Sequence, residues 1–192
     1  MPGDAPHYFR PMEDIEIASA AALWDWLDTH YAQSKSVRIV TWKAAHPGKY
    51  VSREEVLDAL IAYGWVDGRR FVVDADRTAQ LIAPRKQQAW SQSYKDRVER
   101  LRQEGRMRPP GEAAVAAGQA SGLWDFFADV DALIVPDDLA ARIDRGKWDL
   151  LAPSYRRNVL RWIKLAKSEA VRAKRIDTAV TATAKGEKIA QM

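Results

Sequence analysis

The sequence predicts an α+β protein: a small antiparallel β-sheet flanked by helices, followed by an all-helical C-terminal portion. Two observations carry this prediction. Up to about residue 108, apolar runs of helical period alternate with short runs of β-branched and aromatic residues, whereas later segments show helical periodicity alone. We therefore expect an extended arm at 1–17, an α+β domain at 18–108, a helical portion at 109–185 and a frayed tail at 186–192.

The first elements of the α+β domain have clear start and stop signals. A helix is expected to begin at Ser19, and the run Val37–Trp42 is typical of a strand. Ser52 and Glu55 have the spacing of a capping box, which predicts the start of a second helix. Gly64 is expected to end that helix in the left-handed conformation.

Two or three short antiparallel strands are expected between Trp65 and residue 82, with Asp67–Gly68 as a tight turn that exposes the carboxylate. Pro84 should end the last strand, because proline cannot donate to a strand ladder. A helix at about 91–104 follows.

The C-terminal portion is expected to contain helices only. Pro109–Gly111 is interpreted as a joint before an alanine-rich helix at 112–119. Pro136 is expected at the first position of a helix that ends near residue 145. A long amphipathic helix should begin at Pro153, and a lysine- and arginine-rich helix is expected at about 169–184.

Composition excludes several functional classes. The chain has no cysteine, so disulfides, thiolate metal sites and cysteine nucleophiles are excluded. His7, His30 and His46 have no metal-binding spacing, and no metal site or cofactor is expected. No secretory signal and no apolar stretch of about 20 residues is visible, so we expect a soluble, cytoplasmic protein without a membrane span.

Charge is distributed unevenly along the chain. Residues 145–192 carry 12 Lys or Arg against 4 acidic residues, whereas residues 1–144 carry 18 against 22. The basic C-terminal segment could attract nucleic acid or another anionic surface. The alternative, which we favour, is a solvated helix face or a contact with the acidic stretch 112–144.

The candidate site lies in a Trp- and Arg-rich block, Leu60–Met107. Arginine can grip an anion with two hydrogen bonds, tryptophan offers a flat face, and the N-terminus of the helix expected at 91–104 favours negative charge. The expected ligand-binding residues are Trp65, Asp67, Arg85, Lys86, Trp90, Ser91 and Arg106.

Purely structural roles explain the same residues. Asp67 could pair with Arg85 or Arg69, and Trp65 and Trp90 could be core residues. Asp67 is a weak candidate for a general acid or base, because spacing reveals no second catalytic group.

Several short segments along the chain form an ordered pattern of motifs: Ala59–Gly68, Ala83–Arg85, Trp90–Ser91, Gly105–Met107, Trp162–Lys167 and Arg172–Ile176. In these segments the chain resembles the YdeI/OmpD-associated family, whose members are also described as bacteriocin-protection proteins. The resemblance extends over about residues 20–185 and assigns no reaction. It implies a link to antimicrobial-peptide tolerance and to an outer-membrane porin.

Taken with this resemblance, the sequence favours a non-enzymatic, stress- or antimicrobial-peptide-tolerance protein that binds an anionic small molecule or a protein partner. One alternative is a small metal-independent enzyme that uses Asp67 and Arg85. Another is a nucleic-acid-binding protein that uses the basic C-terminal helices. The sequence leaves the oligomeric state open.

Overall fold

The computed structural model describes residues 13–189, which form two compact units. The first unit comprises the described residues up to Gln88 together with 93–123, and the second comprises 89–92 together with the described residues from Trp124 onward. The expected α+β class is confirmed, with the sheet in the first unit and helices alone in the second. Residues 109–123, expected in the helical portion, belong to the first unit.

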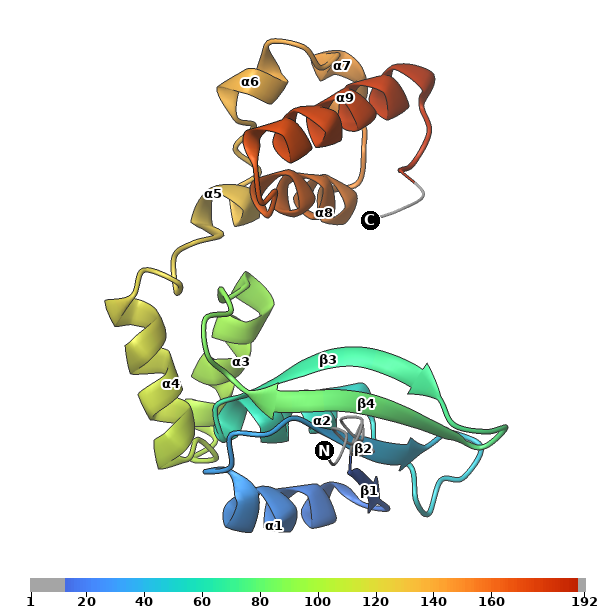
Figure 1. Cartoon of the computed structure of the whole chain (residues 1–192), viewed down its shortest axis with the longest axis vertical. Helices are drawn as coiled ribbons and strands as arrows, with labels where there is room; N and C mark the ends of the chain where they lie inside the picture. The colour runs from blue at the N-terminus through green and yellow to red at the C-terminus, as the bar shows by residue number, and fades with distance from the viewer. Residues whose placement is uncertain (1–12, 190–192) are drawn as a thin grey trace, which may run out of the picture. The chain divides into compact units, whose positions relative to one another are not determined.

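The sheet of the first unit has four strands in the order β1-β2-β4-β3 (Figure 1). Strand β1 (Asp14–Ile17) runs parallel to β2 (Val37–Trp42), and the pairs β2·β4 and β3·β4 are antiparallel. Strand β1 lies in the region expected to be an extended arm. Its alternation places Ile17 in the core, 2% exposed, and this burial ties the segment to the sheet. The rest of that arm, 1–12, lies outside the described residues.

Strands β3 (Trp65–Val72) and β4 (Arg77–Pro84) form a single long hairpin. The expectation of a tight turn at Asp67–Gly68 is wrong, because these residues lie inside β3, where the pairing register shifts between Asp67 and Arg70. The chain turns instead around Asp74, whose Oδ1 accepts hydrogen bonds from the N–H groups of Asp76 (2.9 Å) and Arg77 (2.7 Å). A β-bulge inserts an extra residue and redirects side chains, and simple alternation does not predict it.

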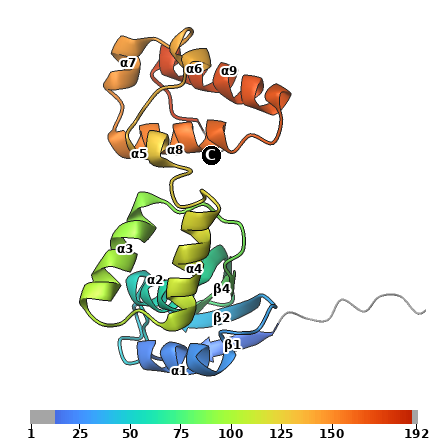
Figure 2. The ribbon, with the colours of Figure 1, turned by 90° about the vertical axis from the view of Figure 1, so that its left-hand side faces the viewer.

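Four helices belong to the first unit, and α2, α3 and α4 gather on one side of the sheet (Figure 2). Their ends follow the predicted signals: Ser19 caps α1, Ser52 and Glu55 form the capping box of α2, and Gly64 has φ +71°. The helices are α1 (Ala20–His30), α2 (Arg53–Ala62), α3 (Gln92–Gln103) and α4 (Pro109–Ala120).

The expected joint at Pro109–Gly111 is instead the first turn of α4. Proline is accepted in a first turn because its missing N–H has no partner there in any helix. A Cβ atom on Gly111 would lie 2.2 Å from the carbonyl oxygen of Ala62, so this glycine lets α4 pack directly against the end of α2.

The second unit is built from five helices within the described residues: α5 (Ala128–Asp131), α6 (Asp137–Ala140), α7 (Arg145–Asp149), α8 (Pro153–Lys164) and α9 (Glu169–Lys185). The long helix expected from Pro136 is wrong: Pro136 is the N-cap of α6, which has only four residues, and α7 starts separately behind the N-cap Asp144. Both short helices bury an apolar residue, Leu139 in α6 and Trp148 in α7, in the core between α8 and α9.

The basic C-terminal helices form ion pairs with the acidic stretch, as the favoured interpretation of the charge pattern expected. Arg172 of α9 donates two hydrogen bonds to Asp138, at 2.7 and 2.8 Å, and Lys164 of α8 lies 2.6 Å from Asp129. These contacts neutralise part of the positive charge of residues 145–192 within the second unit.

Candidate functional site

Two of the expected ligand-binding residues are core residues. Trp65 and Trp90 are each 1% exposed. The Trp65 Nε1–H donates to the carbonyl oxygen of Tyr31 at 3.1 Å, and the Trp90 ring packs against Trp124 with ring centroids 5.1 Å apart. Both indoles therefore have the structural role that the sequence left open as an alternative.

Three other expected residues have separate surroundings. Lys86 is exposed just after β4, and Ser91 belongs with Trp90 to the second unit. Arg106 lies after the end of α3, and its guanidinium is 3.5 Å from the carboxylate of Asp58 on α2, which also pairs with two arginines of α3. Asp67 and Arg85 both contact Tyr94: Asp67 accepts a hydrogen bond from its hydroxyl, and the Arg85 guanidinium lies over its ring.

Asp67 is half-buried on β3 and accepts two hydrogen bonds. One comes from the Tyr94 hydroxyl of α3, and the other comes from Gln80 Nε2 of β4 at 3.2 Å. The Gln80 Oε1 atom in turn accepts a hydrogen bond from Arg70 at 3.3 Å. A hydrogen-bonded chain therefore runs from Arg70 through Gln80 and Asp67 to Tyr94.

Burial sets the protonation of this cluster. It raises the pKa of Tyr94, and the hydrogen bond to the Asp67 carboxylate raises it further. Burial also lowers the pKa of Arg85 to about 10, although the nearby Tyr94 and Asp67 oppose this shift. The Arg85 guanidinium lies 5.4 Å from the centre of the Tyr94 ring. At neutral pH, Tyr94 thus remains a phenol that donates to Asp67, and Arg85 remains a cation.

A small cavity of about 330 Å³ opens beside Asp67. Arg53, Gly68, Arg70 and Gln80 complete its lining. Arg53 is the first residue of α2, so the positive end of that helix lies at the rim of the cavity. Neither Arg53 nor Arg70 forms an ion pair with a carboxylate among residues 13–189. The cavity therefore combines two guanidinium groups that form no ion pair with one carboxylate that is hydrogen-bonded to neutral side chains.

Sequence reasoning did not identify Arg53, Arg70, Gln80 or Tyr94 as site residues. A signal was present for Arg53, because a cation in the first turn of a helix opposes the helix dipole and is unusual there. For Arg70 and Gln80 the sequence holds no comparable signal. Their meeting with Asp67 depends on the register shift in β3.

The arginine cluster around Asp58 is a structural feature. Asp58 on α2 is 6% exposed and lies beside Arg97, Arg100 and Arg106. Burial alone would lower the pKa of Arg97, but hydrogen bonds to Glu54 and Asp58 outweigh burial and raise it. The cluster holds α3 and the segment after it against α2 through internally matched charges.

Among residues 13–189, no three His, Asp or Glu side chains are grouped closely enough to hold a metal ion. Within the same range, no helix is both long and apolar enough to cross a membrane.

Two family models match the chain. Residues 15–114 match a domain of unknown function (DUF8412), and residues 132–186 match the family described as bacteriocin-protection, YdeI or OmpD-associated. The second match confirms the resemblance predicted from the sequence and covers Trp162–Lys167 and Arg172–Ile176. The segments between residues 59 and 107 that suggested the same family lie in the first match instead. No curated protein and no solved structure shows significant similarity to the chain.

Proposed function

The chain belongs to the family of this domain of unknown function and carries a YdeI/OmpD-associated domain at residues 132–186, and from this premise we propose that it binds a small anionic ligand. The observation that carries the proposal is the pair of guanidinium groups, Arg53 and Arg70, that line the cavity beside Asp67 without an ion-pair partner among the described residues.

The chemistry of the cavity suits a carboxylate or a phosphate group. A guanidinium group binds either anion through two parallel hydrogen bonds, and two such groups on one cavity can hold one anion from both sides. The N-terminus of α2 adds a favourable electrostatic contribution. The volume of about 330 Å³ lies at the lower end of the range of small-molecule sites.

The surroundings of Asp67 favour binding over proton transfer. Each oxygen of its carboxylate accepts one hydrogen bond, from Gln80 or from Tyr94, and the raised pKa of Tyr94 keeps its proton in place at neutral pH. General acid–base catalysis also needs a positioned partner group, and the other residues that line the cavity are two arginines, a glycine and a glutamine. These features support a fixed binding site more than the alternative of an enzyme that uses Asp67 and Arg85.

Isothermal titration of the full chain with inorganic phosphate and with citrate tests this proposal. We expect saturable binding, weakened roughly tenfold or more by Arg53→Gln or Arg70→Gln, because each substitution removes a charge-assisted pair of hydrogen bonds. Lys86→Gln removes the same charge from an exposed position outside the cavity lining and should leave the affinity unchanged.

Asp67→Asn provides a test of opposite sign. Removing the carboxylate makes the cavity more positive, so anion binding should become tighter. The proposal is wrong if neither anion binds, or if Lys86→Gln weakens binding as much as the two cavity variants do.

We further propose that the chain protects cells against bacteriocins, which the description of the family that matches residues 132–186 supports. The anion cavity lies in the other match, so its contribution to protection is tested separately. Bacterial cells that express the chain should survive bacteriocin exposure better than cells that express the Arg53→Gln, Arg70→Gln double variant. Equal survival of the two strains would show that the anion site is not needed for protection.

A further inference from the structure

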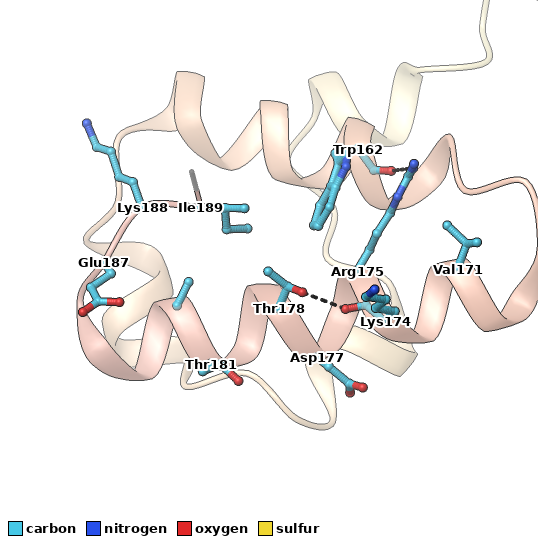
Figure 3. Close-up of a pocket in the computed structure, with 11 residues that line it drawn as sticks. Trp162, Val171, Lys174, Arg175, Asp177, Thr178, Thr181, Glu187, Lys188 and Ile189 are labelled. Atoms are coloured by element: carbon cyan, nitrogen blue, oxygen red, sulfur yellow. Dashed lines mark hydrogen bonds between the residues drawn. The ribbon is translucent and has the colours of Figure 1, made fainter. Parts of the chain in front are cut away.

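A larger groove lies in the second unit between α8 and α9 (Figure 3). Its volume is about 810 Å³, which is the size range of sites for ligands larger than a simple anion. Trp162 of α8 projects into the space between the two helices, between Arg175 and Ile189 (Figure 3). Thr178 reaches into the same space from α9.

The Trp162 ring is held in a fixed position. The Arg175 guanidinium lies 5.1 Å from the ring centroid and also donates a hydrogen bond to the carbonyl oxygen of Trp162. Ile189 is fixed as well, because its N–H donates to the Tyr155 hydroxyl at 2.9 Å and its side chain packs against the core of the unit. The groove therefore has a preformed aromatic wall and an apolar wall, which lowers the entropic cost of binding.

The charges that line the groove are predominantly positive once ion pairs are considered. Asp177 is neutralised by Arg142, at 2.6 Å. Lys174 and Lys188 are exposed and form no ion pair with a carboxylate among residues 13–189, and Glu187 is the one lining acid in that range without a cationic partner. With Arg175, the groove thus carries three cations against one unpaired carboxylate.

We propose that this groove binds a nucleoside phosphate. The groove offers a contact for each part of such a ligand. It has a flat aromatic ring and an apolar wall for the base, a hydroxyl group for the base or ribose, and cations for the phosphates. The base would stack on the Trp162 ring, and the phosphates would be bound by Lys174 or Lys188. Thr178 donates its hydroxyl proton to the Lys174 carbonyl oxygen at 2.9 Å, so its oxygen can still accept a hydrogen bond from a base or a ribose.

This site is distinct from the proposed anion cavity in the first unit, since it shares no residue with it. The proposal also gives the basic segment 145–192 a specific role, which is to bind phosphate groups. Ion pairs within the second unit neutralise part of the positive charge of this segment, but they do not neutralise Lys174 and Lys188.

Isothermal titration of the full chain with AMP, ADP and ATP tests the proposal, with adenosine and inorganic phosphate as partial ligands. We expect one molecule bound per chain at this groove, and affinity for each partial ligand at least roughly tenfold weaker than for ADP, because each lacks one set of contacts. Lys174→Gln and Lys188→Gln together should weaken ADP binding roughly tenfold or more. Lys167→Gln is the matched control, since this exposed lysine of the same unit does not line the groove.

Trp162→Phe should weaken binding while it retains a smaller aromatic ring, and circular dichroism should show that the helices remain folded. The Arg53→Gln, Arg70→Gln variant should bind ADP normally, so that failure of one proposal is distinguishable from failure of the other. The groove proposal is wrong if no nucleotide binds, or if the lysine and Trp162 variants bind as the unmodified chain does. It is also wrong if single-stranded oligonucleotides bind with a steep salt dependence while mononucleotides do not.

Discussion

Asp58 is the buried acid on which the contact between α2 and α3 depends, and its replacement by alanine should destabilise the first unit strongly. Its carboxylate lies 2.5 Å from Arg100 and 3.5 Å from Arg106, and it also pairs with Arg97. The substitution removes one negative charge from among three positive ones.

The magnitude follows from the burial of each arginine. The Arg97 side chain is 12% exposed, whereas Arg100 and Arg106 are 42% and 41% exposed and can turn toward water. Removing one partner of a buried ion pair typically costs about 3–5 kcal/mol. Because Glu54 would still pair with Arg97, we expect the lower end, about 3 kcal/mol, or a fall of roughly 10 °C in the melting temperature.

Urea denaturation followed by tryptophan fluorescence and circular dichroism measures this loss. Glu54→Gln is the matched control: it removes an acid from the same arginine, but the Glu54 side chain is 68% exposed, so its loss should be much smaller. Equal effects of Asp58→Ala and Glu54→Gln, or a loss below about 0.5 kcal/mol for Asp58→Ala, would refute the argument from burial.

Two further predictions concern a close helix contact and an exposed ion pair. Gly111→Ala should lower the free energy of unfolding by about 1–3 kcal/mol in urea denaturation, because the new methyl group would overlap the Ala62 carbonyl oxygen. The prediction fails if Gly48→Ala, whose new methyl group would meet no atom within 4 Å, costs as much. The hydrogen bond from Arg172 lowers the pKa of Asp138, so the unfolded chain binds more protons there and the stabilisation is complete only above about pH 4. Asp138→Asn should therefore destabilise the protein at pH 7 and have a smaller effect at pH 3, and an equal effect at both values would contradict this linkage.

Local signals in the sequence predicted individual elements well. The capping box of Ser52 and Glu55, the cap at Ser19 and the left-handed Gly64 all depend on residues within a few positions of one another. Such interactions are the same in any tertiary context, and a single sequence is enough to predict them. The α+β class follows from the same kind of local periodicity.

Errors arose where a local signal has two structural outcomes. Asp67–Gly68 is typical of a turn, but it also fits a bulged strand, and the pairing of β3 with β4 selected the strand. Pro109–Gly111 suits a joint or a first helical turn, and the close approach of α4 to α2 selected the helix. In both cases, long-range packing made the choice.

The candidate site shows the same division. The sequence by itself determined the fold class, the starts of α1 and α2, the charge asymmetry and the candidacy of Asp67 and Arg85. Only the tertiary structure decided that Tyr94 joins these two residues and that Arg53 and Arg70 line a common cavity. The physical reason is that these contacts join α2, α3, β3 and β4 through strand register and helix packing, which depend on the burial of the whole apolar core and not on the sequence around any one residue.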